Sequence, residues 1–195
     1  MIINMTTTQI KKVKDKYKVT LGDESVLVTE ETVLKFRLFN PKELDNLDEI
    51  KKYDLFESYK NKAISYQVKY AKNSKEVINY LLDKGLDYKE SKEIVDDLIQ
   101  KKILNDQIIA NNLASSLARN SNGLLMIKMK LKNKLFDDEV IDIAINQITI
   151  EDYNYGLEKI IYKANNKYSK LEDDYIRRNK IKEYLYRHGY VGIDI

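Results

Sequence analysis

The chain has 195 residues, 43% of them hydrophobic, and a formal net charge of +3. It contains no cysteine, which excludes disulfides and cysteine-ligated metals, and its one histidine, His188, leaves no histidine-based metal cluster or serine–histidine site. Because it has no apolar run of about 18 residues and no signal-peptide pattern, we expect a soluble cytoplasmic protein without a membrane partner.

The excess of basic residues is weak evidence of function. A chain rich in lysine, asparagine, isoleucine and tyrosine, and poor in glycine, proline and tryptophan, is what an AT-rich coding sequence produces whatever the protein does. The placement of the basic residues is therefore more informative than their number.

Residues 1–50 have the pattern of a small β-structure followed by short helices. Residues 17–21 and 25–28 alternate or are rich in β-branched side chains, and Gly22-Asp23 between them predicts a β-hairpin. Residues 9–13 are a candidate third strand.

A short helix is predicted over residues 30–36. The pair Asn40-Pro41 is interpreted as a helix start, because proline is tolerated at the first helical position. Residues 43–50 are then a helix or a linker into the next part of the chain.

Residues 74–106 predict a helix, a glycine stop, a second helix and the start of a third. Ser74 is expected to cap the first helix. Gly85 is expected to end it, since glycine adopts the left-handed conformation without steric cost. Asp87, followed three residues later by Glu90, resembles a capping box that opens the next helix.

One phrase recurs at intervals of about 50 residues, the signature of a repeat architecture. Its copies are Leu81-x-x-Lys84-Gly85-Leu86, Leu131-x-x-Lys134-Leu135-Phe136 and Leu185-x-x-His188-Gly189-Tyr190. A long helix is predicted before each copy, over residues 56–70, 107–120 and 151–170.

The fold class that follows is mainly α, with tandem three-helix repeats in an elongated curved stack behind the N-terminal hairpin. The repeats are assigned to residues 51–103, 104–150 and 151–195, the last with a shortened final helix. Each unit is too small to bury its own apolar faces, so neighbours must stack.

Residues 124–134 present a conflict between local pattern and repeat. Residues 127–132 alternate apolar and basic side chains, which alone predicts a strand. Alignment with the first repeat predicts a helix instead, with Leu124, Ile127 and Leu131 facing inward. We follow the repeat.

Basic residues gather on the middle helices of the second and third repeats, whereas residues 137–152 carry acids and no base. A ladder of basic helices can follow a phosphate backbone. The alternative is a solvated surface shaped by helix dipoles, which the balanced charges of the first repeat favour. The candidate contact residues are Arg119, Lys128, Lys130, Lys132, Arg177, Arg178 and Lys182.

No pattern in the sequence indicates catalysis or a cofactor. There is no nucleotide-binding glycine loop and no metal-ligand spacing, so we expect a protein that is not an enzyme. The 15 tyrosines invite a base-stacking interpretation, but the helical spacing of Tyr59, Tyr66 and Tyr70 favours a core or rim position.

Two segments resemble the RecX family of regulatory proteins, which modulate the RecA recombinase. They are S-K-E-V-I-N-Y-L-L-D-K-G-L-D over residues 74–87 and K-K-I-L-N-D-Q-I-I-A over residues 101–110. The segment over residues 22–38 is similar to the N-terminal extension of RecX from low-GC Gram-positive bacteria. Leu135 departs from the family, which has glycine at that position.

The resemblance implies a non-enzymatic regulator that lies in the groove of the RecA filament on single-stranded DNA and lowers ATP turnover and strand exchange. We expect it to be a monomer and to use no cofactor. The resemblance implies the RecA nucleoprotein filament as partner, and single- or double-stranded DNA is a further candidate. Our hypothesis is that the seven basic residues contribute to the filament or DNA contact. Two alternatives are a direct DNA-binding module, with a middle helix in a groove, and a helical scaffold for another protein.

Overall fold

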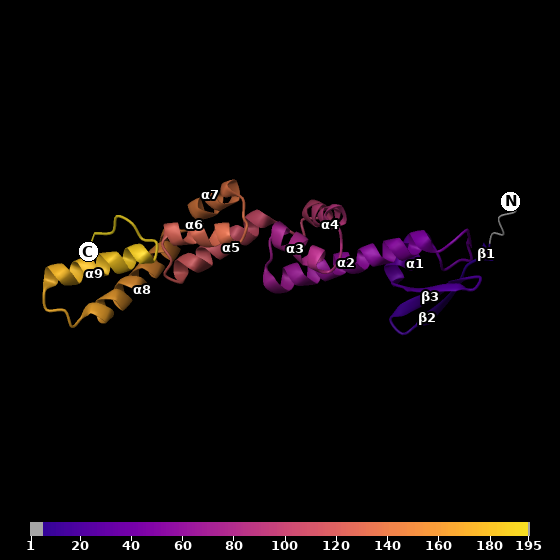
Figure 1. Ribbon diagram of the computed structural model, residues 1–195, viewed down its shortest axis with the longest axis horizontal. Coiled ribbons are helices and arrows are strands. Elements are labelled where there is room, and N and C mark those ends of the chain that lie inside the picture. The colour runs from indigo at the N-terminus through magenta and orange to yellow at the C-terminus, as the bar shows by residue number, and fades with distance from the viewer. Residues whose placement is uncertain (1–5, 195) are drawn as a thin grey trace. The chain divides into compact units, whose positions relative to one another are not determined.

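The computed structural model describes residues 6–194 (Figure 1), and its contacts divide the chain into two compact units, one ending at Ser65 and one beginning at Tyr66. The described part is mainly helical with a small antiparallel sheet, which confirms the predicted class. Its strands are β1 (Thr6–Thr7), β2 (Gln9–Val13), β3 (Lys16–Leu21), β4 (Glu24–Val28) and β5 (Glu43–Leu44). Its helices are α1 (Glu30–Phe36), α2 (Asp48–Tyr70), α3 (Ser74–Asp83), α4 (Tyr88–Gln100), α5 (Asp106–Arg119), α6 (Leu124–Asn133), α7 (Asp138–Asn146), α8 (Ile150–Tyr168) and α9 (Asp174–Arg187).

The N-terminal unit contains the predicted hairpin, and the candidate third strand is confirmed. The strand order is β2-β3-β4, antiparallel throughout. Alternate residues of β3 face inward, so Tyr17, Val19 and Leu21 are buried with Val28 of β4 and Val33 of α1. One face of the sheet therefore makes the core of this unit.

The helix start predicted at Asn40-Pro41 is wrong. Residues 43–44 form β5, which pairs with β1, and the next helix begins only at Asp48. The backbone N–H of Thr8 donates to the carbonyl of Lys42, and the N–H of Lys42 donates to Oγ1 of Thr8, each at 2.9 Å. These bonds to a distant segment hold the chain extended beyond the proline.

The C-terminal unit confirms the helix over residues 124–134, since α6 is helical and buries Ile127 and Leu131. The cap of α3 is corrected, because Asn73 accepts from the N–H of Glu76 in a reciprocal capping box. Ser74 instead donates to the Asp106 carboxylate.

Between α9 and residue 194 there is no further helix. The three repeat boundaries stay a prediction.

Small residues let the long helices α5 and α8 approach closely. Ala110, Ala114 and Ala118 of α5 are fully buried. A Cβ at Gly156 of α8 would overlap the carbonyl oxygen of Ala118. The crossing of these two helices is therefore fixed by backbone contact, which places α6 and α9 in turn.

Helices α3, α6 and α9 are the middle helices of the three predicted repeats. They meet end to end through hydrogen bonds. At the start of α3, Nδ2 of Asn73 donates to the carbonyl of Lys134, the C-cap of α6, at 2.6 Å. At the start of α6, the N–H of Gly123 donates to the carbonyl of His188, the C-cap of α9, at 2.7 Å. The N–H of Leu125 donates to Gly189 at 3.3 Å. Helix ends that otherwise lack partners are thus paired with each other.

Gly123→Ala is expected to destabilise the fold by about 2–3 kcal/mol, because the added Cβ would overlap the backbone of Gly189 and force the junction apart. The measurement is the free energy of unfolding in urea. The matched control uses two variants at the exposed N-cap of α4, Asp87→Gly and Asp87→Ala. The difference between their free energies of unfolding gives the intrinsic cost of alanine relative to glycine at a cap. A Gly123→Ala cost no larger than that difference would contradict the close contact.

Leu135→Gly is expected to stabilise the fold by up to about 1 kcal/mol. Leu135 has a φ of +65°, in the left-handed region, where Gly85 and Gly189 occupy the matching positions of the recurring phrase at +96° and +85°. Relief of about 1–2 kcal/mol of strain exceeds the extra backbone entropy of glycine, about 0.5–1 kcal/mol. Thermal melts of both forms test this, with Gly85→Ala as the opposite change. A lower melting temperature for Leu135→Gly would count against it.

Candidate interaction surface

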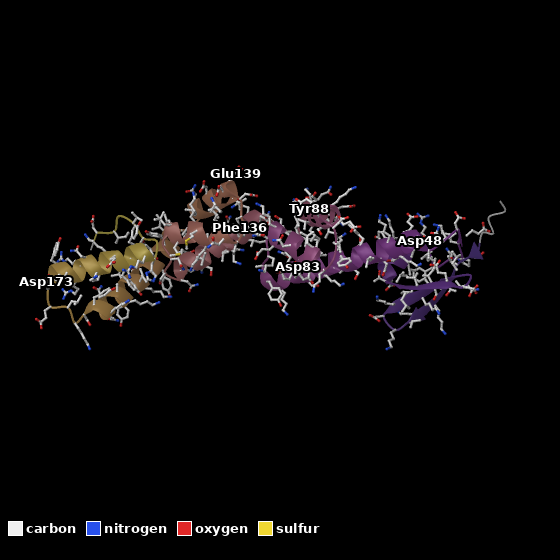
Figure 2. All side chains as sticks on the ribbon, viewed as in Figure 1. Asp48, Asp83, Tyr88, Phe136, Glu139 and Asp173 are labelled. Atoms are coloured by element: carbon white, nitrogen blue, oxygen red, sulfur yellow. The ribbon has the colours of Figure 1, made fainter. Side chains whose placement is uncertain are left out.

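The lysines predicted on α6 lie beside the acids of α7. Nζ of Lys128 is 2.8 Å from Asp142, and Nζ of Lys132 is 3.4 Å from Asp138. The hydrogen bond to Asp142 raises the pKa of Lys128 above its ordinary value. Phe136 and Glu139, labelled in Figure 2, mark the turn that brings these two helices together. The acid-rich and base-rich segments of the sequence therefore neutralise each other in space.

Lys130 does not share the face of Lys128 and Lys132. It is half-buried, and its Nζ donates to Oδ1 of Asn122 at 2.6 Å. Asn122 in turn donates to the carbonyl of Leu117. A spacing of two residues places side chains on opposite sides of a helix. The structure therefore does not bring the three lysines together as one ladder.

The predicted arginines are also paired. Nε of Arg119 is 3.2 Å from the Asp152 carboxylate of α8. On α9, Arg177 and Arg178 both pair with Asp174. Lys182 is exposed and forms no ion pair with an acid in residues 6–194.

These pairs are exposed enough to exchange partners. The side chains of Lys128 and Asp142 are 48% and 58% exposed, and those of Lys132 and Asp138 are both 67% exposed. Ion pairs in such positions contribute about 0–1 kcal/mol. A phosphate or carboxylate of a partner can therefore replace the α7 acid at little cost.

Aromatic and basic side chains also gather where α2 meets α3. The rings of Tyr66 and Tyr80 stack with centroids 4.1 Å apart, and Tyr70 lies 5.5 Å from Tyr66. Nζ of Lys72 is 5.8 Å from the Tyr66 ring, and that of Lys84 is 5.5 Å from the Tyr80 ring. The helical spacing of Tyr66 and Tyr70 predicts a core or rim position, but it does not reveal that Tyr80 of α3 stacks on Tyr66.

A second cluster of the same kind lies where α8 meets α9. Tyr184 contacts Tyr168 and His188, with centroids 6.2 and 4.4 Å away, and Nζ of Lys167 is 4.9 Å from the Tyr184 ring. Tyr184 stands directly before Leu185 of the recurring phrase, as Tyr80 stands directly before Leu81. Alignment of the predicted repeats places Tyr80 and Tyr184 at equivalent positions. The sequence could therefore have predicted that the two clusters correspond to each other.

No group of three or more His, Asp or Glu side chains among residues 6–194 could hold a metal ion. Within the same residues, no helix is both long and apolar enough to cross a membrane. The fold and its surfaces define a mainly helical protein with exposed ion pairs and aromatic clusters where its helices meet.

The comparisons with known proteins identify the family. No family model matches the chain. The chain is 30% identical over 202 residues to regulatory protein RecX of Lactococcus lactis subsp. lactis, covering 96% of this chain and 75% of that protein. It is 26% identical to regulatory protein RecX of Streptococcus uberis, covering 93% and 72%.

Solved structures agree in fold. A crystal structure of regulatory protein RecX matches with a TM-score of 0.71 at 20% identity, covering 95% of this chain and 94% of that one. RecX from Lactobacillus salivarius matches with a TM-score of 0.64 at 24% identity, covering 70% and 89%. The chain belongs to the RecX family of regulatory proteins, which confirms the resemblance and the expectation that it is not an enzyme.

Asp138→Asn with Asp142→Asn is expected to change the free energy of unfolding by no more than about 1 kcal/mol, because the pairs that these residues make are exposed. The change frees Lys128 and Lys132, so the variant should elute later from a heparin column. Glu93→Gln with Glu158→Gln changes the net charge equally and is the control, because neither side chain forms an ion pair within residues 6–194. Equal retention of the two variants would show that only bulk charge matters.

Proposed function

We propose that the chain regulates RecA by lying in the groove of the RecA filament on single-stranded DNA, and that it thereby lowers ATP hydrolysis and strand exchange. The observation that carries the proposal is the similarity to RecX regulatory proteins along nearly the whole chain. RecX is a family of RecA regulators, so RecA is the partner that the family implies. The protein acts in this proposal as a monomer, in the cytoplasm.

The contact is proposed to use basic residues of α5, α6 and α9, all of them exposed except Lys130 and Arg177, which are half-buried. The ion pairs that Arg119, Lys128, Lys132, Arg177 and Arg178 now make are weak enough to be exchanged for filament carboxylates or DNA phosphates. Weak contacts repeated along the C-terminal unit add through effective concentration, so no single strong site is required. The residues are Arg119, Lys128, Lys130, Lys132, Arg177, Arg178 and Lys182.

The structure distinguishes two groups within this set. Lys128 and Lys132 share one face of α6, and their removal leaves only exposed acids behind. Lys130 also supports Asn122, so its loss mixes a contact with a local structural change. Lys128 and Lys132 are therefore the better pair for a functional test.

Lys128→Gln with Lys132→Gln is expected to weaken inhibition of RecA-catalysed, DNA-dependent ATP hydrolysis roughly fivefold, the effect of about 1 kcal/mol from two exposed charges. The measurement is the protein concentration that halves the ATPase rate. Lys89→Gln with Lys92→Gln on α4 removes the same charge and should leave that concentration unchanged.

Binding to RecA-coated and bare DNA separates this proposal from a direct DNA-binding module. A filament regulator should bind RecA-coated single-stranded DNA far better than either component. Equal affinity for bare DNA at physiological salt, or an unchanged ATPase rate with the unmodified chain, would overturn the proposal.

A further inference from the structure

The outer face of the N-terminal sheet is strongly basic. In the register of β2 with β3, Lys11 stands opposite Lys18 and Val13 opposite Lys16. Tyr17 and Val19 of β3 are buried, so the neighbouring Lys16 and Lys18 point to the opposite, exposed side. In Figure 2, side chains tipped with nitrogen extend from the side of the sheet away from α1.

This outer face contains no acidic side chain. Alternation along the three strands assigns eight residues to it, all of them basic, neutral polar or apolar. They are Gln9, Lys11, Val13, Lys16, Lys18, Thr20, Ser25 and Leu27. Asp15 and Asp23 lie in the turns at the two ends of β3, beyond the paired residues.

The three lysines of this outer face have no charge partner within the described residues. No acid in residues 6–194 forms an ion pair with Lys11, Lys16 or Lys18. The nearest acid along β4, Glu24, lies on the inner side and pairs with Lys51. This outer face therefore differs from α6 and α9, where acids neutralise most of the predicted basic residues.

The arrangement has a cost in stability that the fold does not explain. Like charges directly opposite each other on neighbouring strands are destabilising, and Lys11 faces Lys18 in this way. Lysines on an edge strand also guard against aggregation, which accounts for Lys11 on β2. It does not account for Lys16 and Lys18, because β3 is the central strand.

We propose that the outer face of this sheet binds the sugar–phosphate backbone of nucleic acid, in particular single-stranded DNA, without sequence preference. The charge complementarity is direct, because three unpaired lysines meet a regular polyanion. Lys16 and Lys18 are separated by about 6.6 Å along the strand and point to the same face, so both can contact one phosphate backbone at the same time.

The remaining residues of the face fit the same partner. Gln9, Thr20 and Ser25 offer neutral hydrogen-bond donors, a group that commonly contacts phosphate and sugar oxygens. Leu27, half exposed, and Val13 are the apolar residues of the face. A membrane-binding surface normally adds a larger apolar face that enters the lipid boundary, which two scattered residues do not supply.

The test uses the full chain, a fluorescein-labelled thirty-nucleotide oligothymidine, and fluorescence anisotropy over a range of salt concentrations, without RecA. The variant Lys11→Gln, Lys16→Gln, Lys18→Gln is expected to bind roughly tenfold more weakly. The slope of its log binding constant against log salt concentration should become shallower by about 2, which is the contribution of three phosphate contacts on a single strand. The control Lys89→Gln, Lys92→Gln, Lys101→Gln removes the same charge from α4 and should change affinity no more than about twofold, within the scatter of a nonspecific charge effect.

Stability provides a second readout. Removal of the repulsion between Lys11 and Lys18 should leave the melting temperature of the variant unchanged or higher. Lys11→Thr with Lys18→Thr, which introduces a residue favoured in strands, should also weaken DNA binding on an intact fold. Because it removes two of the three lysines, the slope of log affinity against log salt concentration should fall by about 1.4.

Three results would overturn the proposal. The first is unchanged affinity and salt slope in both lysine variants. The second is an equal loss in the α4 control, which would indicate bulk charge alone. The third is that the unmodified chain binds phosphatidylserine vesicles or polyglutamate as tightly as the oligonucleotide, which would indicate a lipid or an acidic protein instead. The inference does not depend on the proposed function, because the assay contains no RecA.

Discussion

The C-terminal unit depends on the hydrogen-bonded junctions between the ends of its middle helices. An isolated helix end leaves backbone groups without partners, and its partial charges are of opposite sign at the two ends. Here the C-cap carbonyl of one middle helix accepts from the start of another, through Asn73 at one junction and Gly123 at the next. The same contact thus satisfies the helix ends and sets the register between successive helices.

The two junctions use different side chains because the available space differs. Asn73 is buried and carries both functions, accepting within its own helix and donating across to Lys134. At Gly123 the backbone of Gly189 is so close that no side chain fits, and the backbone N–H donates directly. A common geometry is therefore compatible with unrelated residue types, which explains why the recurring phrase alone does not reveal the junction.

Most of the helical fold could be predicted from the sequence, because helix ends and buried stripes are local patterns. The helix over residues 124–134 shows the limit, since its alternating lysines predict a strand and only comparison with an equivalent segment corrects this. The errors fell where distant segments meet. Lys42 is held by Thr8, and Ser74 by Asp106. Neither partner is visible from the local pattern.

The basic surface was predicted less well, because a count of charges along the chain ignores which charges meet in space. The lysines of α6 and the acids of α7 form separate blocks in sequence, yet the turn between the helices brings Lys128 to Asp142 and Lys132 to Asp138. In β3, alternation with Tyr17 and Val19 places Lys16 and Lys18 on a face without acids. A charge whose partner comes from the same chain is already neutralised, whereas one without such a partner adds its full effect to the field that a polyanion meets. The sheet therefore presents its positive charge unopposed, while α6 must first exchange partners.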